Sequence, residues 1–222
     1  MPDTQLPDDA PATALFPQFD SAIYRMIATE VEGLTDPQLD FESDEWEWSK
    51  WSIRRNLSHM ASGDFRWFLL RWGPQLFPNG LPDLGGDDLE SLAASPHDRR
   101  LDEEKYWDLD SILEKLRQGL EVAQTILSRE TVGSLRSKET GEAGPSPGRW
   151  FAEAHPTGVR WESDDSSRSY LTLEATFRHR YFEHITHLYN IQRLKRAQGL
   201  PAQVEVPFEG YWALPDWDRS EP

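Results

Sequence analysis

YLTLEATFRHRYFEHITHLYNIQRLKRAQ, residues 170–198, is the stretch of sequence that decides the fold. Its apolar residues recur at spacings of three and four, namely Leu173, Phe177, Tyr181, Ile185, Leu188, Ile191 and Leu194. This period places them on one face of an amphipathic α-helix. Gly199 and Pro201 follow the pattern and predict the C-terminal end of the helix.

Three earlier segments show the same helical period. One covers residues 15–34, and a second covers residues 52–72, with Ser52 as a favourable N-cap. A third covers residues 111–127 and begins with a capping box at Ser111. Four amphipathic helices joined by long connections predict an all-α fold, a four-helix bundle with long crossover connections.

The connections between these helices are rich in proline and glycine. Residues 73–106 form a long loop, in which we expect a short helix around residues 87–94. Residues 131–169 are also irregular, and residues 158–161 predict a short strand or hairpin. Long connections inside a compact domain often carry function.

The domain organisation follows from where the periodicity begins and ends. Residues 1–13 lack periodicity and predict a disordered or loosely docked N-terminal tail. Residues 14–200 form the helical bundle. Residues 201–222 form an extended, aromatic and acidic C-terminal tail, which we expect to pack on the bundle or on a partner subunit.

Composition limits the class of function. The chain has 23 Lys and Arg against 39 Asp and Glu, a net charge of −16 that repels phosphate backbones and argues against nucleic-acid binding. It has no cysteine, which excludes disulfides, thiolate nucleophiles and Cys-type zinc sites. With no apolar run of membrane-spanning length and no secretory signal, we expect a cytoplasmic protein that binds no membrane.

The histidines predict a metal site. On the last helix, His179, Glu183 and His187 are four residues apart and form a row, while His184 and His187 are neighbours at a spacing of three. Either arrangement can chelate a metal ion. The third ligand should come from a facing helix, and His59 is the only histidine on the three preceding helices.

WSIRRNLSHM, residues 51–60, resembles the second-helix motif of the DinB superfamily, the damage-inducible and YfiT-like bundles. In that motif Trp-Ser stands shortly before a metal-binding histidine, whose position here is His59. Residues 33–41 also resemble the link that follows the first helix of the family. The resemblance covers roughly residues 15–200.

The last helix resembles the family in spacing but departs from it in one residue. The family commonly shows two histidines separated by three residues, followed by a glutamine. Alignment on the aliphatic residues places this pair at Glu183 and His187, with Asn190 in the glutamine position. The resemblance therefore implies His59, Glu183 and His187 as metal ligands. Two alternatives stay open: a shift of one residue that recruits His184, or loss of the metal.

The resemblance also implies a class of chemistry. Characterised relatives include thiol S-transferases that use bacillithiol or mycothiol, a mycothiol-dependent isomerase and the iron-binding domain of ergothioneine-type sulfoxide synthases. The leading hypothesis is a homodimeric enzyme whose divalent metal ion (Zn, Ni, Fe or Mn) activates a low-molecular-weight thiol for S-transfer to a small-molecule electrophile. The alternatives are a non-catalytic metal-binding or ligand-binding stress-response module and a metal-dependent hydrolase.

Overall fold

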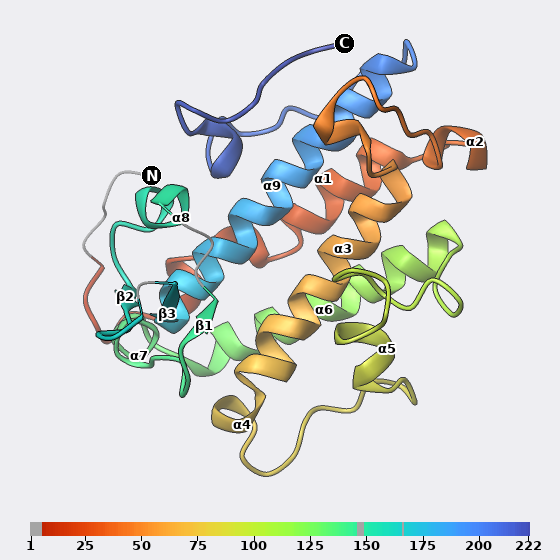
Figure 1. Ribbon diagram of the computed structural model, residues 1–222. Coiled ribbons are helices and arrows are strands. Elements are labelled where there is room, and N and C mark those ends of the chain that lie inside the picture. The colour runs from red at the N-terminus through yellow and green to blue at the C-terminus, as the bar shows by residue number, and fades with distance from the viewer. Residues whose placement is uncertain (1–5, 146–148, 166) are drawn as a thin grey trace.

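The computed structural model describes residues 6–145, 149–165 and 167–222, and much of this chain is helical. The longest helices are α1 (Ala22–Val31), α3 (Ile53–Phe65), α6 (Leu109–Arg129) and α9 (Leu173–Ala197) (Figure 1). The prediction of a predominantly helical chain is confirmed. Among the described helices, none combines the length and the apolar composition required to cross a bilayer.

Shorter elements fill the connections. The short α-helices are α2 (Asp36–Leu39), α4 (Gly73–Leu76), α5 (Leu89–Ala93), α7 (Val132–Ser137) and α8 (Arg149–Ala154). A π-helical segment, Arg66–Arg71, continues α3, and 3₁₀ turns lie at Ala12–Ala14, Pro17–Phe19, Glu47–Ser49 and Tyr211–Ala213. A small antiparallel sheet has the strand order β1-β3-β2, from Gly144–Pro145, Arg168–Leu171 and Val159–Trp161.

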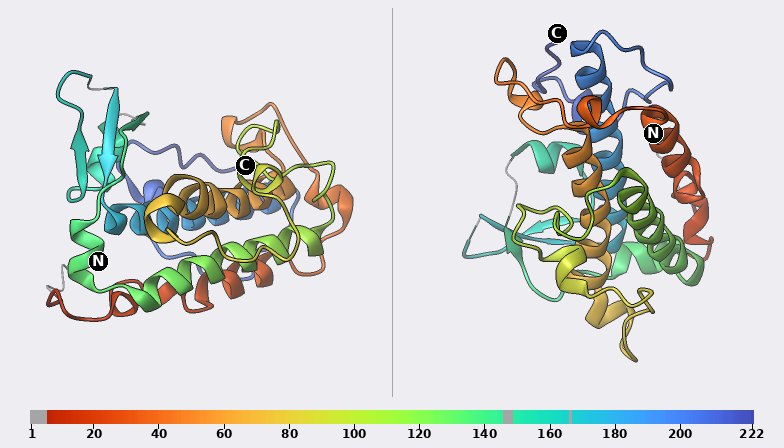
Figure 2. Two further views of the ribbon diagram at one scale, coloured as in Figure 1. Left: turned by 90° about the horizontal axis from the view of Figure 1, so that it is seen from below. Right: turned by 90° about the vertical axis from the view of Figure 1, so that its right-hand side faces the viewer.

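Helix α3 lies at the centre of the packing, between α6 and α9, and α1 contacts both α6 and α9. Figure 2 shows α6 and α1 running together below α3 and α9 in its left view, with the small sheet at one end of the helices. The apolar face predicted for the last helix is buried in this core: Leu173, Phe177, Ile185, Leu188, Ile191 and Leu194. Burial of each such side chain contributes about 1.5–3 kcal/mol.

The helix starts test the capping predictions. Ser52 caps α3 as predicted, because its side chain accepts a hydrogen bond from the backbone N–H of Arg55. The predicted start at Ser111 is wrong: Asp108 is the N-cap of α6, and its carboxylate accepts the backbone N–H of Ser111. Aspartate caps a helix as well as serine does, and Asp108 comes one turn earlier.

The first predicted helix is too long. Residues 15–34 were expected to be continuous, but α1 begins only at Ala22. Pro17 starts a separate 3₁₀ turn, and Ser21 has a left-handed backbone with φ 66°, which a continuous α-helix does not allow. The apolar side chains of Phe16 and Phe19 are nevertheless buried. The periodicity therefore predicted which side chains are buried, but it wrongly predicted that this segment is an α-helix.

The connections contain more structure than predicted. The short helix expected around residues 87–94 is α5, and the hairpin expected around residues 158–161 is formed by β2 and β3. Helices α7 and α8 lie in residues 131–169, which were expected to be irregular. The last helix was predicted to start at Tyr170, but Tyr170 lies in β3 and Thr172 caps α9.

Both tails contact the helices. Residues 1–5 of the predicted N-terminal tail lie outside the described residues, whereas Asp8 and Ala10 accept backbone hydrogen bonds from residues 132–133. The C-terminal tail runs along α9 (Figure 1), where Tyr189 donates to Glu221 and Arg193 donates to the carbonyl of Asp218. The described part of each tail therefore has defined partners on this chain.

A fully buried charged cluster joins α3 to α9. Arg180 Nε donates to Asp64 Oδ1 at 2.9 Å and Arg180 Nη2 donates to the carbonyl of Met60 at 3.0 Å. His184 Nε2 lies 3.1 Å from both oxygens of Asp64, so it donates to that carboxylate. Burial by itself raises the pKa of Asp64, but His184 and Arg180 outweigh burial and hold the pKa below its ordinary value.

Gly63 makes room for this cluster, and Gly63→Ala is expected to destabilise the fold. A Cβ atom at residue 63 would lie 2.5 Å from Arg180 Nη2 and 2.6 Å from its Cζ. Overpacking of this kind costs about 1–3 kcal/mol and exceeds the ~1 kcal/mol that alanine gains in helix propensity. Urea unfolding measures the loss. Gly141→Ala is the control, because its Cβ would meet only Gln75 Nε2, at 3.6 Å; equal stability of the two variants would contradict the prediction.

Candidate metal centre

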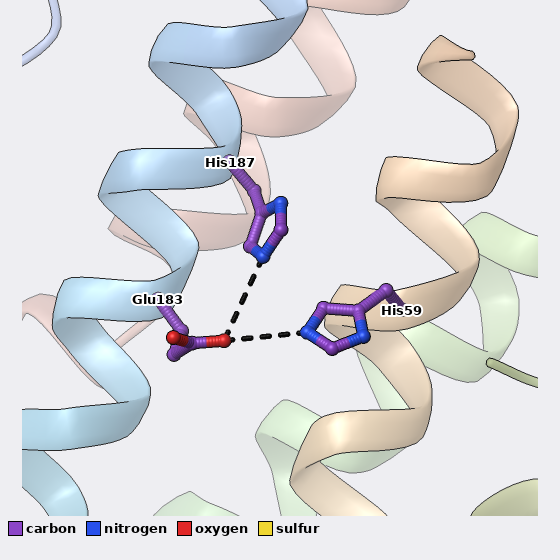
Figure 3. Close-up of side chains that lie close together, drawn as sticks. All are labelled: His59, Glu183 and His187. Carbon is purple, nitrogen blue, oxygen red and sulfur yellow. Dashed lines mark hydrogen bonds and ion pairs between the residues drawn. The ribbon is translucent and has the colours of Figure 1, made fainter. Parts of the chain in front are cut away.

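His59, Glu183 and His187 converge on one point between α3 and α9 (Figure 3). Glu183 Oε2 lies 3.3 Å from His59 Nε2 and 3.6 Å from His187 Nε2. One ligand atom from each residue lies within 4.8 Å of the others, so the group can hold a metal ion. The three side chains are shielded from solvent, with exposed fractions of 5% for His59, 19% for Glu183 and 15% for His187.

The loop at residues 97–101 orients His59. Its Nδ1 donates to the carbonyl of Arg99 at 3.1 Å, which leaves Nε2 to face Glu183. Asp98 and Arg99 have left-handed backbones, with φ of 31° and 61°. Such conformations cost about 1–3 kcal/mol each in residues other than glycine and gather at functional sites. Ser58 Oγ accepts the N–H of Leu101 and fixes the loop to α3.

Asn56 orients His187. The Nδ2 atom of Asn56 donates to the carbonyls of Trp51 and Ser52, at 3.1 and 2.9 Å, so the Oδ1 atom is the one that faces α9. His187 Nδ1 donates to that oxygen at 2.7 Å. Residue 56 is one helical turn before His59, and α3 therefore supplies both a candidate ligand and the partner of the opposite ligand.

These contacts determine which atoms carry protons. Carbonyl oxygens only accept hydrogen bonds, so Nδ1 carries a hydrogen in both His59 and His187, and in the tautomer that binds metal Nε2 carries the lone pair. Their Nε2 lone pairs then face the carboxylate of Glu183. Two lone pairs and a carboxylate oxygen thus converge without a donor among them, and a metal cation satisfies all three. Metal-ligating histidines usually hold their second nitrogen in this way.

The surroundings favour the required charge states. Burial lowers the pKa of His59 to about 3, even though Glu183 opposes this shift, so the ring is neutral at pH 7. Neutral imidazoles and an ionised carboxylate are the forms that bind metal.

The other two histidines of α9 lie elsewhere. His184 is fully buried and bonded to Asp64, so the alternative in which it replaces Glu183 has no geometric support. His179 belongs to the predicted row but lies 2.5 Å, Nδ1 to hydroxyl, from Tyr211 of the C-terminal tail. His155 Nε2 lies 2.8 Å from the same hydroxyl. The structure thus brings together His59, Glu183 and His187. His179 and His184 lie outside this group.

Of the aromatic residues Trp51, Trp67 and Tyr181, it is Trp51 that borders the centre. Its ring packs on His59 with centroids 5.2 Å apart, and the guanidinium of Arg100 covers it at 5.2 Å. Trp67 packs instead on His179, and Tyr181 donates to Glu209. The sequence analysis predicted neither Asn56 nor the backbone carbonyl of Arg99 as an orienting partner, because no sequence pattern marks such a role.

Asn56→Leu is expected to weaken metal binding about 10–100-fold, because the ring of His187 loses the acceptor that orients it. Affinity is measured by competition with a chromophoric chelator. Asn190→Leu is the matched control: Asn190 lies on the turn after His187, and its Oδ1 accepts from Arg193 at 2.5 Å. We expect the control to bind metal as the parent does, and an equal loss in both variants would rule out an orienting role for Asn56.

The three-sided arrangement leaves coordination positions for water or for a ligand, as in catalytic metal sites with three protein ligands. Two helices and one strained loop thus hold a small set of nitrogen and oxygen donors in place. Comparison of the chain with protein-family models, with curated proteins and with solved structures gave no match.

Proposed function

We propose that this chain is a DinB/YfiT-like four-helix bundle that uses a divalent metal ion to activate a low-molecular-weight thiol for S-transfer to an electrophile. The observation that carries the proposal is the convergence of His59 Nε2, His187 Nε2 and Glu183 Oε2, with each ring held through Nδ1 by a carbonyl oxygen. The resemblance of residues 51–60 to the family's second-helix motif supports it.

The donor set suits the proposed metal. Two imidazole nitrogens and one carboxylate oxygen accept Zn²⁺, Ni²⁺, Fe²⁺ or Mn²⁺. A divalent ion held there supplies Lewis acidity, which lowers the pKa of a thiol or of water and provides a nucleophile at neutral pH. His59 and His187 would hold the ion through Nε2, and Glu183 would hold it through a negatively charged carboxylate. Arg99 and Asn56 orient the two imidazole rings.

The proposal includes a compartment and an assembly. Low-molecular-weight thiols are kept reduced in the cytoplasm, which is therefore the compartment that the reaction requires. The homodimer rests on the family resemblance alone, and light scattering of the purified protein tests it. A monomer with full activity would remove the dimer from the proposal and leave the chemistry in place.

Thiol activation tests the proposal directly. Protein loaded separately with each metal is titrated with a thiol, and thiolate absorbance reports the pKa of that thiol. We expect a lowered pKa and turnover of a thiol-reactive electrophile such as monobromobimane, with both effects absent in His59→Ala. Tight metal binding without either effect would favour the binding module, and hydrolysis of an activated ester in the absence of thiol would favour the hydrolase.

A further inference from the structure

Two buried guanidinium nitrogens near the metal centre have no hydrogen-bond partner in the described part of the chain. They are Nη1 of Arg66 and Nη1 of Arg180. Nη1 of Arg180 is close to one acceptor, because it lies 4.0 Å from Glu183 Oε2. The other nitrogens of Arg180 donate to Asp64 and to the carbonyl of Met60. Arg66 forms no ion pair with any described acid. A buried N–H donor without an acceptor is costly, and native structures rarely leave one.

The contacts between α3 and α9 place Arg66 beside the centre. His59 faces Glu183, a Cβ at Gly63 would touch Arg180, and Trp67 packs on His179, so the two helices run antiparallel past each other. Arg66 is seven residues after His59 and shares its face, with the two Cα atoms about 10 Å apart along the axis. Helical side chains lean toward the N-terminus, which directs the guanidinium back toward His59.

Arg66 lies among charged groups of both signs, the cations Arg180 and Arg99 and the carboxylates Glu183 and Asp98. No acidic residue in the described part of the chain forms an ion pair with Arg66. Burial, Arg180 and Arg99 lower the pKa of Arg66 to about 10, although Glu183 and Asp98 oppose this shift. The group is still protonated at pH 7, and neither carboxylate forms a direct ion pair with it.

The backbone gives a separate indication. Arg66 is the first residue of the π-helical segment Arg66–Arg71, which interrupts the regular hydrogen bonding of α3. Segments of this kind are uncommon and are frequent at functional sites. The side chain of Arg66 is partly exposed, although its Nη1 is buried.

We propose that Arg66 forms a subsite for a carboxylate group beside the metal centre. The planar guanidinium fork of Arg66 matches a carboxylate in two parallel hydrogen bonds. This inference rests on the proposed function and narrows its substrate: the small molecule at the open metal position carries a carboxylate, so a neutral molecule of the same length binds more weakly.

The subsite is tested first without metal. Succinate is titrated into metal-free protein by calorimetry, for the parent and for Arg66→Gln, Arg66→Lys and Arg71→Gln. We expect at least about a tenfold loss of affinity in Arg66→Gln and a smaller loss in Arg66→Lys, which keeps the charge without the fork. Arg71→Gln is the matched control, since its Nη2 is also buried and unpartnered but lies five residues farther along; we expect it to bind as the parent does.

A second arm uses zinc-loaded protein. Mercaptoalkanoates of three to six carbons are compared with mercaptoalcohols of equal length, and we expect the acids to bind about tenfold more tightly in the parent but not in Arg66→Gln. If zinc does not bind but the affinity for succinate still depends on Arg66, the proposed function fails and the proposal of the carboxylate subsite stands. The subsite is overturned if Arg66→Gln binds succinate as the parent does, if Arg71→Gln loses as much, or if inorganic phosphate binds more tightly than succinate. Circular dichroism melts show that each variant is folded.

Discussion

His59→Ala, Glu183→Ala and His187→Ala are each expected to lose stoichiometric metal. The loss of an outer partner of a metal ligand costs about 10–100-fold in affinity, so the loss of a ligand is expected to exceed about 100-fold. Each variant removes one of the three donors that converge within 4.8 Å. Metal content after dialysis against a weak chelator, measured by inductively coupled plasma mass spectrometry, gives the result.

His184→Ala separates this centre from its closest rival. His184 neighbours Glu183 in sequence but bonds to Asp64, so its removal is expected to lower stability and to leave the metal content unchanged. Stoichiometric metal in His59→Ala would refute the centre. Loss of metal in a folded His184→Ala chain, with retention in Glu183→Ala, would move the ligand by one residue.

Asp64→Asn is expected to lower the free energy of unfolding by about 3–5 kcal/mol, the cost of removing one partner of a buried ion pair. Asp64 and Arg180 are both 0% exposed, so the guanidinium would remain in the core with only Glu183, 4.0 Å from its Nη1, as a counter-charge. The shape of the side chain is preserved, which separates the effect of charge from that of a cavity. Urea unfolding followed by circular dichroism provides the measurement.

Asp36→Asn is the control for this prediction. Asp36 also pairs with a buried arginine, Arg54, but it is 85% exposed and Asp40 remains to bind the same guanidinium. Exposed pairs contribute about 0–1 kcal/mol, so little change is expected. Losses of similar size in the two variants would mean that the burial of Asp64 is not the cause of its contribution.

Much of the fold could be predicted because helical periodicity records burial. The apolar face of α9 and the cap at Ser52 could both be predicted from the sequence, since each depends on residues close together in the chain. Helix ends were less readable. Ser111 and Asp108 are both good caps, and only the packing of Leu109 against the core selects the earlier one.

Spacing and residue type restricted the candidate ligands to His59 and the cluster at residues 179–187, and the resemblance of the sequence to the DinB superfamily implied the choice of Glu183 and His187. The surroundings of the ligands could not be predicted. The acceptor for His59 is a backbone carbonyl in a loop 40 residues away, and any residue type provides a carbonyl. The pairing of Asp64 with Arg180 spans 116 residues and follows no period. Arg66 was not singled out, because a missing partner is visible only when the neighbours are in place.

The contact between His59 and Glu183 spans 124 residues. Ribosomes add about 5–20 residues per second, so α3 emerges on the order of ten seconds before α9 does. During that interval the nascent chain holds one imidazole and none of its partners, and a metal ion has no complete centre to enter. Metal that binds only the folded chain then adds to its stability by mass action. On the proposed function, a chain whose translation stops before α9 gains no stability from metal and differs from the full chain in its susceptibility to proteases.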